Sequence, residues 1–215
     1  MANFRASTAD LLAHYERVLG PCARRWINDP RDPKQSLADV SGLRDEDLYQ
    51  VLKFDNRPQR GASTYLTYGL SRKVLTAHDP RSNESRSIRI ELVACARDDI
   101  GSAYIAYLLM SFGNAMLRKM QAPVNGEIIR MGSVLENPKF QYLYCSEPLL
   151  HPQELVVFNG TSPETVLAWL FPITAAEADF VVTKGYRTFH ELLRTEDTDV
   201  LAFDRRSEVR IPQPC

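Results

Sequence analysis

The sequence lacks the short motifs that mark the common nucleotide-binding and hydrolytic sites. It contains no glycine-rich phosphate loop ending in Lys and Ser or Thr, and no Gly-x-Gly-x-x-Gly fingerprint for a dinucleotide. Gly69-Leu70-Ser71 begins like the turn that carries a nucleophilic serine, but Arg72-Lys73 follows where a second glycine is needed. No local pattern therefore supports these classes of enzyme.

Pairs of metal-binding residues at short spacing are also missing. The cysteines are Cys22, Cys95, Cys145 and Cys215, and the histidines are His14, His78, His151 and His190. Because these residues are scattered, without a Cys-x-x-Cys pair or two histidines within one helical turn, we expect no metal and no cofactor. We expect the cysteines to be reduced thiols, and each histidine to face solvent or make one hydrogen bond.

Excess charge of one sign and long apolar runs are absent as well. The 26 Lys and Arg residues nearly balance the 27 Asp and Glu residues, so no global field favours nucleic acid or an anionic membrane. The first residues, 1–5, lead into a polar segment without the apolar stretch of a secretory signal. We expect a cytoplasmic protein with no membrane and no nucleic-acid partner.

The composition is that of an ordinary folded chain. Apolar residues make up 44% of the sequence and charged residues 25%, which are average values for globular proteins. A length of 215 residues is compatible with one large domain, and no repeat or low-complexity tract divides it. We therefore expect a single domain over residues 1–215.

The amino-terminal part, residues 1–45, predicts one helix followed by loops. An apolar stripe at spacings of three and four consists of Leu11, Leu12, Tyr15 and Leu19. Ser7 or Thr8 is expected to cap this helix, and Gly20-Pro21 to end it. Turn-forming Asn, Asp and Pro residues from Trp26 to Gly42 predict no regular structure until about Asp45.

The rest of the chain predicts an α/β fold of the α+β sandwich type, with helices packed on a mixed sheet. Strands are expected at 47–54, 64–71, 87–95, 127–131, 140–145, 155–158 and 166–171. A long helix is expected from Asp98-Asp99 to about Met120, and a capping box of Thr174 and Glu177 predicts another helix as far as Lys184-Gly185. A short helix carrying Phe189, Leu192 and Leu193 should follow.

The strand at 87–95 alternates, so its two faces should differ. Ile88, Ile90, Leu92 and Ala94 lie on one face, while Arg89, Glu91 and Val93 lie on the other, which should be partly wet. The polar segment from Thr76 to Ser85 before it predicts a surface loop. We expect one continuous core that contains Ile90, Leu92, Leu109, Phe112, Leu167 and Phe180.

The order of features from Tyr65 to Leu193 is typical of one family. The features are the aromatic strand Tyr65–Ser71 ending in Gly-Leu-Ser, the Glu-Leu strand at Ile90–Leu92, a long helix through Ile105, Leu109 and Phe112, the strand Leu167–Ile173, the capped helix at Thr174–Glu177, and Lys184-Gly185 followed by Leu192-Leu193. This order resembles the suppressor-of-fused-like family. The resemblance implies an α/β sandwich without cofactor or known catalytic residues. Animal members bind a segment of a transcription factor, and some bacterial members look like immunity proteins.

The leading hypothesis is therefore a non-catalytic module that binds another protein, most concretely an immunity-type protein that neutralises a toxin. An enzyme whose site assembles from scattered residues and a subunit of a homo-oligomer are the alternatives. Loops held by a rigid sheet often carry binding residues, so we expect the partner surface on the polar loop and the wet face of the next strand. The candidate residues are Asp79, Arg81, Asn83, Glu84, Arg89 and Glu91. A merely solvated loop is the competing interpretation.

Overall fold

The computed structural model describes residues 4–34, 36–131, 139–195 and 199–201, which contain ten strands and five helices. The strands are β1 Arg24–Asn28, β2 Tyr49–Asp55, β3 Ala62–Tyr68, β4 Leu75–Asp79, β5 Glu84–Arg97, β6 Gln121–Ala122, β7 Ile128–Arg130, β8 Tyr142–Ser146, β9 Val157–Phe158 and β10 Thr165–Ile173. The helices are α1 Phe4–Leu19, α2 Ser102–Lys119, α3 Gln153–Val156, α4 Ala175–Lys184 and α5 Tyr186–Thr195. No helix in these ranges is long and apolar enough to cross a bilayer.

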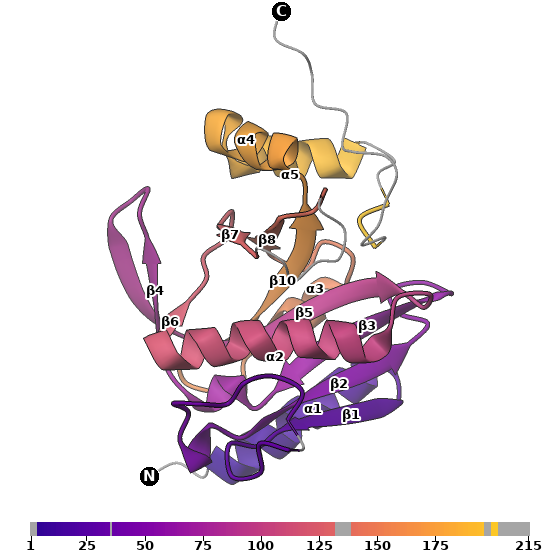
Figure 1. The fold of residues 1–215 in the computed structure, drawn as a ribbon, viewed down its shortest axis with the longest axis vertical. Coiled ribbons are helices and arrows are strands. Elements are labelled where there is room, and N and C mark those ends of the chain that lie inside the picture. Colours follow the sequence, from indigo (N-terminus) through magenta and orange to yellow (C-terminus); the bar gives the residue numbers. More distant parts are fainter. Residues whose placement is uncertain (1–3, 35, 132–138, 196–198, 202–215) are drawn as a thin grey trace, which may run out of the picture.

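The strands form a mixed sheet in the order β1-β2-β3-β5-β10-β8-β7 (Figure 1). Along this order β10 is parallel to β5, and the other neighbouring pairs are antiparallel. The short strand β9 pairs with β10, while β4 extends from β5 as a hairpin and also pairs with β6. The predicted α/β class with a mixed sheet is confirmed.

Two apolar cores lie on opposite faces of this sheet. The α2-side core contains Ile90, Leu92 and Leu109, with Phe112 packed against it. The α4-side core, which α1, α4 and α5 cover, contains Leu167 and Phe180. The prediction of one continuous core is therefore wrong. The central strands β5 and β10 are buried on both faces, so alternate side chains of each strand enter different cores.

The amino-terminal segment is more regular than its sequence suggests. The helix α1 is described from Phe4, so it begins before the predicted start at Ser7 or Thr8, and its buried stripe includes Tyr15 as predicted. The strand β1 occupies part of the region expected to be irregular, and its Trp26 and Asn28 face inward. A five-residue edge strand depends on pairing with β2, and the sequence around it does not reveal that partner.

Three expected strand or loop boundaries are wrong. The strand predicted at 64–71 ends at Tyr68, where Gly69 has φ +118° and a 3-10 turn, Leu70–Arg72, follows. The segment predicted as a strand at 155–158 begins as the one-turn helix α3 and only then forms β9. The expected loop from Thr76 to Ser85 is mostly the hairpin of β4 and β5, with a turn at 80–83.

The helix starts predicted at Asp98-Asp99 and at Thr174 differ in outcome. Asp98 does not cap α2, which begins at Ser102; its carboxylate accepts a hydrogen bond from the Ser63 hydroxyl at 2.6 Å. The capping box of α4 is confirmed. Glu177 N donates to Thr174 Oγ1 at 3.2 Å, and Thr174 N donates to Glu177 Oε2 at 2.7 Å. Gly185, with φ +85°, ends α4 as predicted.

Candidate functional site

The predicted partner-binding residues separate into two groups. Asp79, Arg81, Asn83 and Glu84 lie on the β4–β5 hairpin, where the last three are exposed and Asp79 is partly exposed. Arg89 is half-buried, and its guanidinium donates to the Ser71 carbonyl at 2.8 Å. Glu91 is fully buried. The expected continuation of an exposed surface along β5 is therefore wrong, because β5 is a central strand covered on both faces.

The Glu91 carboxylate instead binds the turn that follows β3. Its Oε1 accepts hydrogen bonds from Gly69 N at 2.8 Å, Ser71 N at 3.0 Å and Ser71 Oγ at 2.7 Å. Its Oε2 accepts one from Thr67 Oγ1 at 2.7 Å. Burial raises the pKa of Glu91, and these hydrogen bonds act in the opposite direction. We refer to Glu91, Thr67, Gly69 and Ser71 as the Glu91 turn.

The Glu91 turn gives the Gly-Leu-Ser and Glu-Leu patterns one structural explanation. Gly69 needs a positive φ of +118°, and a Cβ there would lie 3.1 Å from Tyr49 Cβ. Ser71 supplies two of the donors to the carboxylate. The two sequence patterns therefore form a single hydrogen-bonded unit that fixes β3 against β5, which is a structural role.

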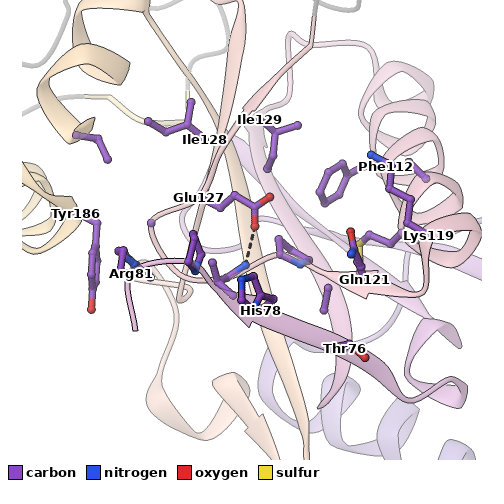
Figure 2. Close-up of a pocket in the computed structure, with 18 of the residues that line it drawn as sticks. Thr76, His78, Arg81, Phe112, Lys119, Gln121, Glu127, Ile128, Ile129 and Tyr186 are labelled. Carbon is purple, nitrogen blue, oxygen red and sulfur yellow. Dashed lines mark hydrogen bonds between the residues drawn. The ribbon is translucent and has the colours of Figure 1, made fainter. Parts of the chain in front are cut away.

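A groove of about 690 Å³ lies beside the β4–β5 hairpin (Figure 2). Its walls come from β4 and its turn, the carboxyl-terminal half of α2, the segment from β6 to β7, and the junction of α4 and α5. The large apolar side chains that line it include Phe112, Met116, Ile128, Ile129, Val181 and Val182. Val182 is 77% exposed, the highest value among the exposed large apolar residues described. The groove is thus a mainly apolar surface open to solvent.

Arg81 holds the hairpin against one end of the groove. Its guanidinium donates to both Asp79 carboxylate oxygens, at 2.7 and 2.8 Å, and to the Asn125 carbonyl at 2.7 Å. It also lies 4.4 Å from the ring centroid of Tyr186, and Figure 2 shows the two side chains stacked. Because Arg81 donates to it, the pKa of Asp79 falls to about 2. Asp79 and Arg81 therefore stand beside the groove, but their charges are largely satisfied within the chain.

The other ionisable side chains of the groove differ in their hydrogen-bond partners. Glu127 Oε2 accepts a hydrogen bond from Val124 N at 2.9 Å. Lys119, at the end of α2, lines the groove and is exposed, and it has no hydrogen-bond or ionic partner among the residues that the structure describes. His78 Nδ1 is hydrogen-bonded to Ser85 Oγ at 3.0 Å. Glu127 is also exposed and bonds an uncharged backbone amide, so among the described residues both Lys119 and Glu127 lack a partner of opposite charge.

A second cluster of reactive residue types lies inside the protein. His151 Nε2 is 2.9 Å from Thr64 Oγ1 and 3.9 Å from Cys95 Sγ. Burial raises the pKa of Cys95 to about 12 and lowers that of His151 to about 4. The cysteine is therefore a thiol and the imidazole is neutral, whereas a nucleophilic cysteine needs its thiolate. This cluster does not have the properties of a catalytic pair.

The described cysteines are unpaired thiols, as the sequence predicts. Cys22, Cys95 and Cys145 are free, and Cys215 lies outside the described residues. Within the described ranges no three His, Cys, Asp or Glu residues are grouped so that they could hold a metal ion.

The sequence placed one residue of the groove lining, Arg81, and its ion-pair partner Asp79 in a partner-binding surface, but the groove itself was missed. The lining comes from segments more than a hundred residues apart, and each apolar residue there reads as an ordinary part of its own helix or strand. The one usable signal is the apolar run Phe180-Val181-Val182. Three consecutive residues span about 200° of a helix, which is wider than one apolar face, so one of them must point outward.

Comparison with known proteins gives one family and several solved structures. The profile described as suppressor of fused protein matches residues 45–206. A crystal structure described as that of a suppressor-of-fused homologue from Neisseria gonorrhoeae has a TM-score of 0.69 at 16% identity. The match covers 98% of this chain and all of that one. No curated protein matches the sequence significantly.

Two further structures resemble the chain. A chain in the Sufu–Fu complex has a TM-score of 0.62 at 15% identity, covering 95% of this chain and 91% of that one. Suppressor of Fused from Drosophila has a TM-score of 0.53 at 16% identity, covering 75% of this chain and 42% of that one. At such low identity these structures show a common fold.

Proposed function

The chain belongs to the suppressor of fused protein family, and on that premise we propose that it is a non-catalytic module that binds another protein through the groove beside the β4–β5 hairpin. The observation that carries this proposal is the exposed apolar lining, above all Val182 with 77% of its surface exposed. Exposed apolar grooves with a polar rim mark interaction sites. A chain of the same fold in the Sufu–Fu complex gives further support.

The hairpin forms the rim of this proposed site. Asp79 and Arg81 shape its wall, and the exposed Asn83 and Glu84 extend beyond it at the tip. Arg89 and Glu91 contribute only by holding β5 and the neighbouring turn in place. Polar rims around an apolar centre tune association more than they determine affinity.

We further propose that the module works in the cytoplasm and that its partner is a toxin domain, which makes the chain an immunity-type protein. The support is the resemblance to bacterial family members and the mainly apolar lining of the groove. A protein that neutralises an enzyme needs only to bind it.

The experiment has two steps. The partner is first identified by mass spectrometry after capture from native extract, and its affinity for the wild-type chain is then measured with purified proteins. Val182→Asp should weaken that affinity at least ~30-fold without changing the urea midpoint, because it places a carboxylate in the apolar centre. Tyr107→Asp is the matched control, since Tyr107 is 39% exposed on a helix and does not line the groove.

Equal affinities of wild type and Val182→Asp would overturn the groove as the site. The immunity function is tested separately. Expression of the identified partner alone should stop growth, and coexpression of this chain should restore it. A partner that is harmless when expressed alone would contradict the immunity function and leave the binding function standing.

A further inference from the structure

The sequence contains two Asn-Gly pairs, Asn125-Gly126 and Asn159-Gly160. In such a pair the backbone nitrogen of the glycine can attack the side-chain carbonyl carbon of the asparagine, because glycine has no Cβ to obstruct the approach. Both asparagines are exposed, so water reaches each of them. Sequence and exposure therefore do not distinguish the two pairs, and a difference in reactivity must come from how the fold holds them.

The peptide unit of Asn125-Gly126 is hydrogen-bonded at both ends. The Asn125 carbonyl accepts a hydrogen bond from the Arg81 guanidinium at 2.7 Å, and Gly126 N donates to the Cys145 carbonyl at 2.8 Å. A Cβ at Gly126 would lie 2.6 Å from Tyr186 Cβ, so Tyr186 packs directly on the glycine. We refer to these contacts of Arg81, Cys145 and Tyr186 as the Gly126 clamp. The clamped peptide unit can turn towards the asparagine side chain only when this wall of the groove opens locally.

The peptide unit of Asn159-Gly160 is held less firmly. It lies in the turn between β9 and β10, and in the described part of the chain neither the Asn159 carbonyl nor Gly160 N has a hydrogen-bond partner. The Phe158 ring packs against Gly160, where a Cβ would overlap it, but an apolar ring accepts no hydrogen bond of ordinary strength from the amide. Rotation of this peptide unit therefore breaks no hydrogen bond among the described residues.

We propose that Asn159 is a site of spontaneous deamidation and that the Gly126 clamp protects Asn125 from the same reaction. In the first step Gly160 N forms a bond to Asn159 Cγ, its proton passes to the side-chain amide nitrogen, and that nitrogen leaves as ammonia. The product is a five-membered succinimide ring. Water then adds to one of the two ring carbonyls and the ring opens, which gives an aspartate or an isoaspartate with a new negative charge.

The protected pair is the one at which the reaction would alter the groove. Gly126 lines the groove, and the Asn125 carbonyl holds Arg81 in its wall. An isoaspartate in place of Asn125 would lengthen the backbone by a carbon atom and displace that carbonyl. Asn159 and Gly160 do not line the groove, so deamidation there leaves the proposed binding surface intact. The reaction itself does not depend on the function proposed above.

The test follows both pairs in one sample of the full-length chain. The purified protein is kept at 37 °C and pH 8, and peptide mapping by mass spectrometry measures the deamidated fraction at each pair over time. Asn159 should react at least ~10-fold faster than Asn125, because only the Asn125 pair must first lose hydrogen bonds and packing. In concentrated urea the two rates should approach each other, since unfolding removes the Gly126 clamp.

A variant tests the Gly126 clamp separately. Arg81→Ala should speed the reaction of Asn125 at least ~5-fold, because its carbonyl loses a charged donor, and the rate at Asn159 in the same sample should stay that of the wild type. Arg86→Ala is the matched control, since Arg86 is an exposed arginine of the same hairpin and does not line the groove; it should change neither rate.

The outcomes separate the two parts of the proposal. Equal rates at the two pairs of the folded wild type, or a faster reaction at Asn125, would overturn it. An Asn159 that stays intact in the folded chain while it reacts in urea would show that the turn is held after all, which removes the site. A wild-type rate at Asn125 in Arg81→Ala would overturn the protection by Arg81.

Discussion

The Glu91 turn and the groove differ in how far their side chains find partners within the chain. The Glu91 carboxylate is fully buried, yet it accepts four hydrogen bonds. The groove leaves Val182 77% exposed and Lys119 without a partner in the described residues. A charge whose contacts are all internal stabilises the fold, and a surface whose contacts are incomplete is available to another molecule.

The largest expected effect on stability comes from removing the carboxylate of the Glu91 turn. Glu91→Ala should lower the free energy of unfolding by about 3 kcal/mol or more, because it leaves buried donors of Gly69, Ser71 and Thr67 without an acceptor. Urea denaturation measures this loss. Glu91→Gln, which keeps the shape and one acceptor oxygen, should lose less. A loss below about 1 kcal/mol for Glu91→Ala would contradict the structural role.

A second buried group should make stability depend on pH. The folded-state pKa of His151 is about 4, against 6.5 for the ordinary side chain. As pH falls below 6.5 the unfolded chain takes up the proton first, so the contribution of neutral His151 is complete above pH 6.5 and is lost towards pH 4. This difference corresponds to about 3 kcal/mol.

The comparison is made with His151→Gln. When the pH is lowered from 7 to 4.5, the urea midpoint should fall further for the wild type than for the variant, because only the wild type has this histidine to protonate. Parallel falls in the two proteins would show that His151 does not contribute. The result bears on the inner cluster with Cys95, which belongs with the Glu91 turn as a closed, structural site.

The contrast between the two regions also explains what the sequence could and could not predict. Local rules sufficed for the α4 capping box and for the buried stripe of α1, because each depends on residues within a few positions of one another. Glu91 was wrongly predicted to be exposed, because polar residues at alternate positions of a strand are typical of a solvent-facing side. Only the order of strands in the sheet reveals that β5 is central. The groove needed four distant segments to be placed together, which no local pattern encodes.

The α4 cap offers a smaller effect within the fold. Thr174→Ala should lower the free energy of unfolding by about 1 kcal/mol, because Glu177 N loses the hydroxyl that accepts its hydrogen bond. Thr174→Ser, which keeps the hydroxyl, should recover most of the loss. Equal urea midpoints for the wild type and Thr174→Ala would argue against the cap as a source of stability.

The smallest expected effect lies at the hairpin tip, the rim of the groove. Glu84 is exposed, so Glu84→Arg should change the free energy of unfolding by less than about 0.5 kcal/mol. It should also change the rate of association with the identified partner by a few fold, since rim charges act mainly on association rates. Stopped-flow or surface-binding kinetics would check this, and an unchanged association rate would contradict a place for the hairpin tip in the binding surface.

The central claim is that the Glu91 turn builds the fold and the groove binds the partner. Its most direct test measures urea stability and affinity for the identified partner on the same samples of Val182→Asp and Glu91→Gln. Val182→Asp should keep the wild-type midpoint and lose affinity, whereas Glu91→Gln should have a lower midpoint and keep its affinity per folded molecule. Wild-type affinity in Val182→Asp, or lost affinity in fully folded Glu91→Gln, would contradict the account.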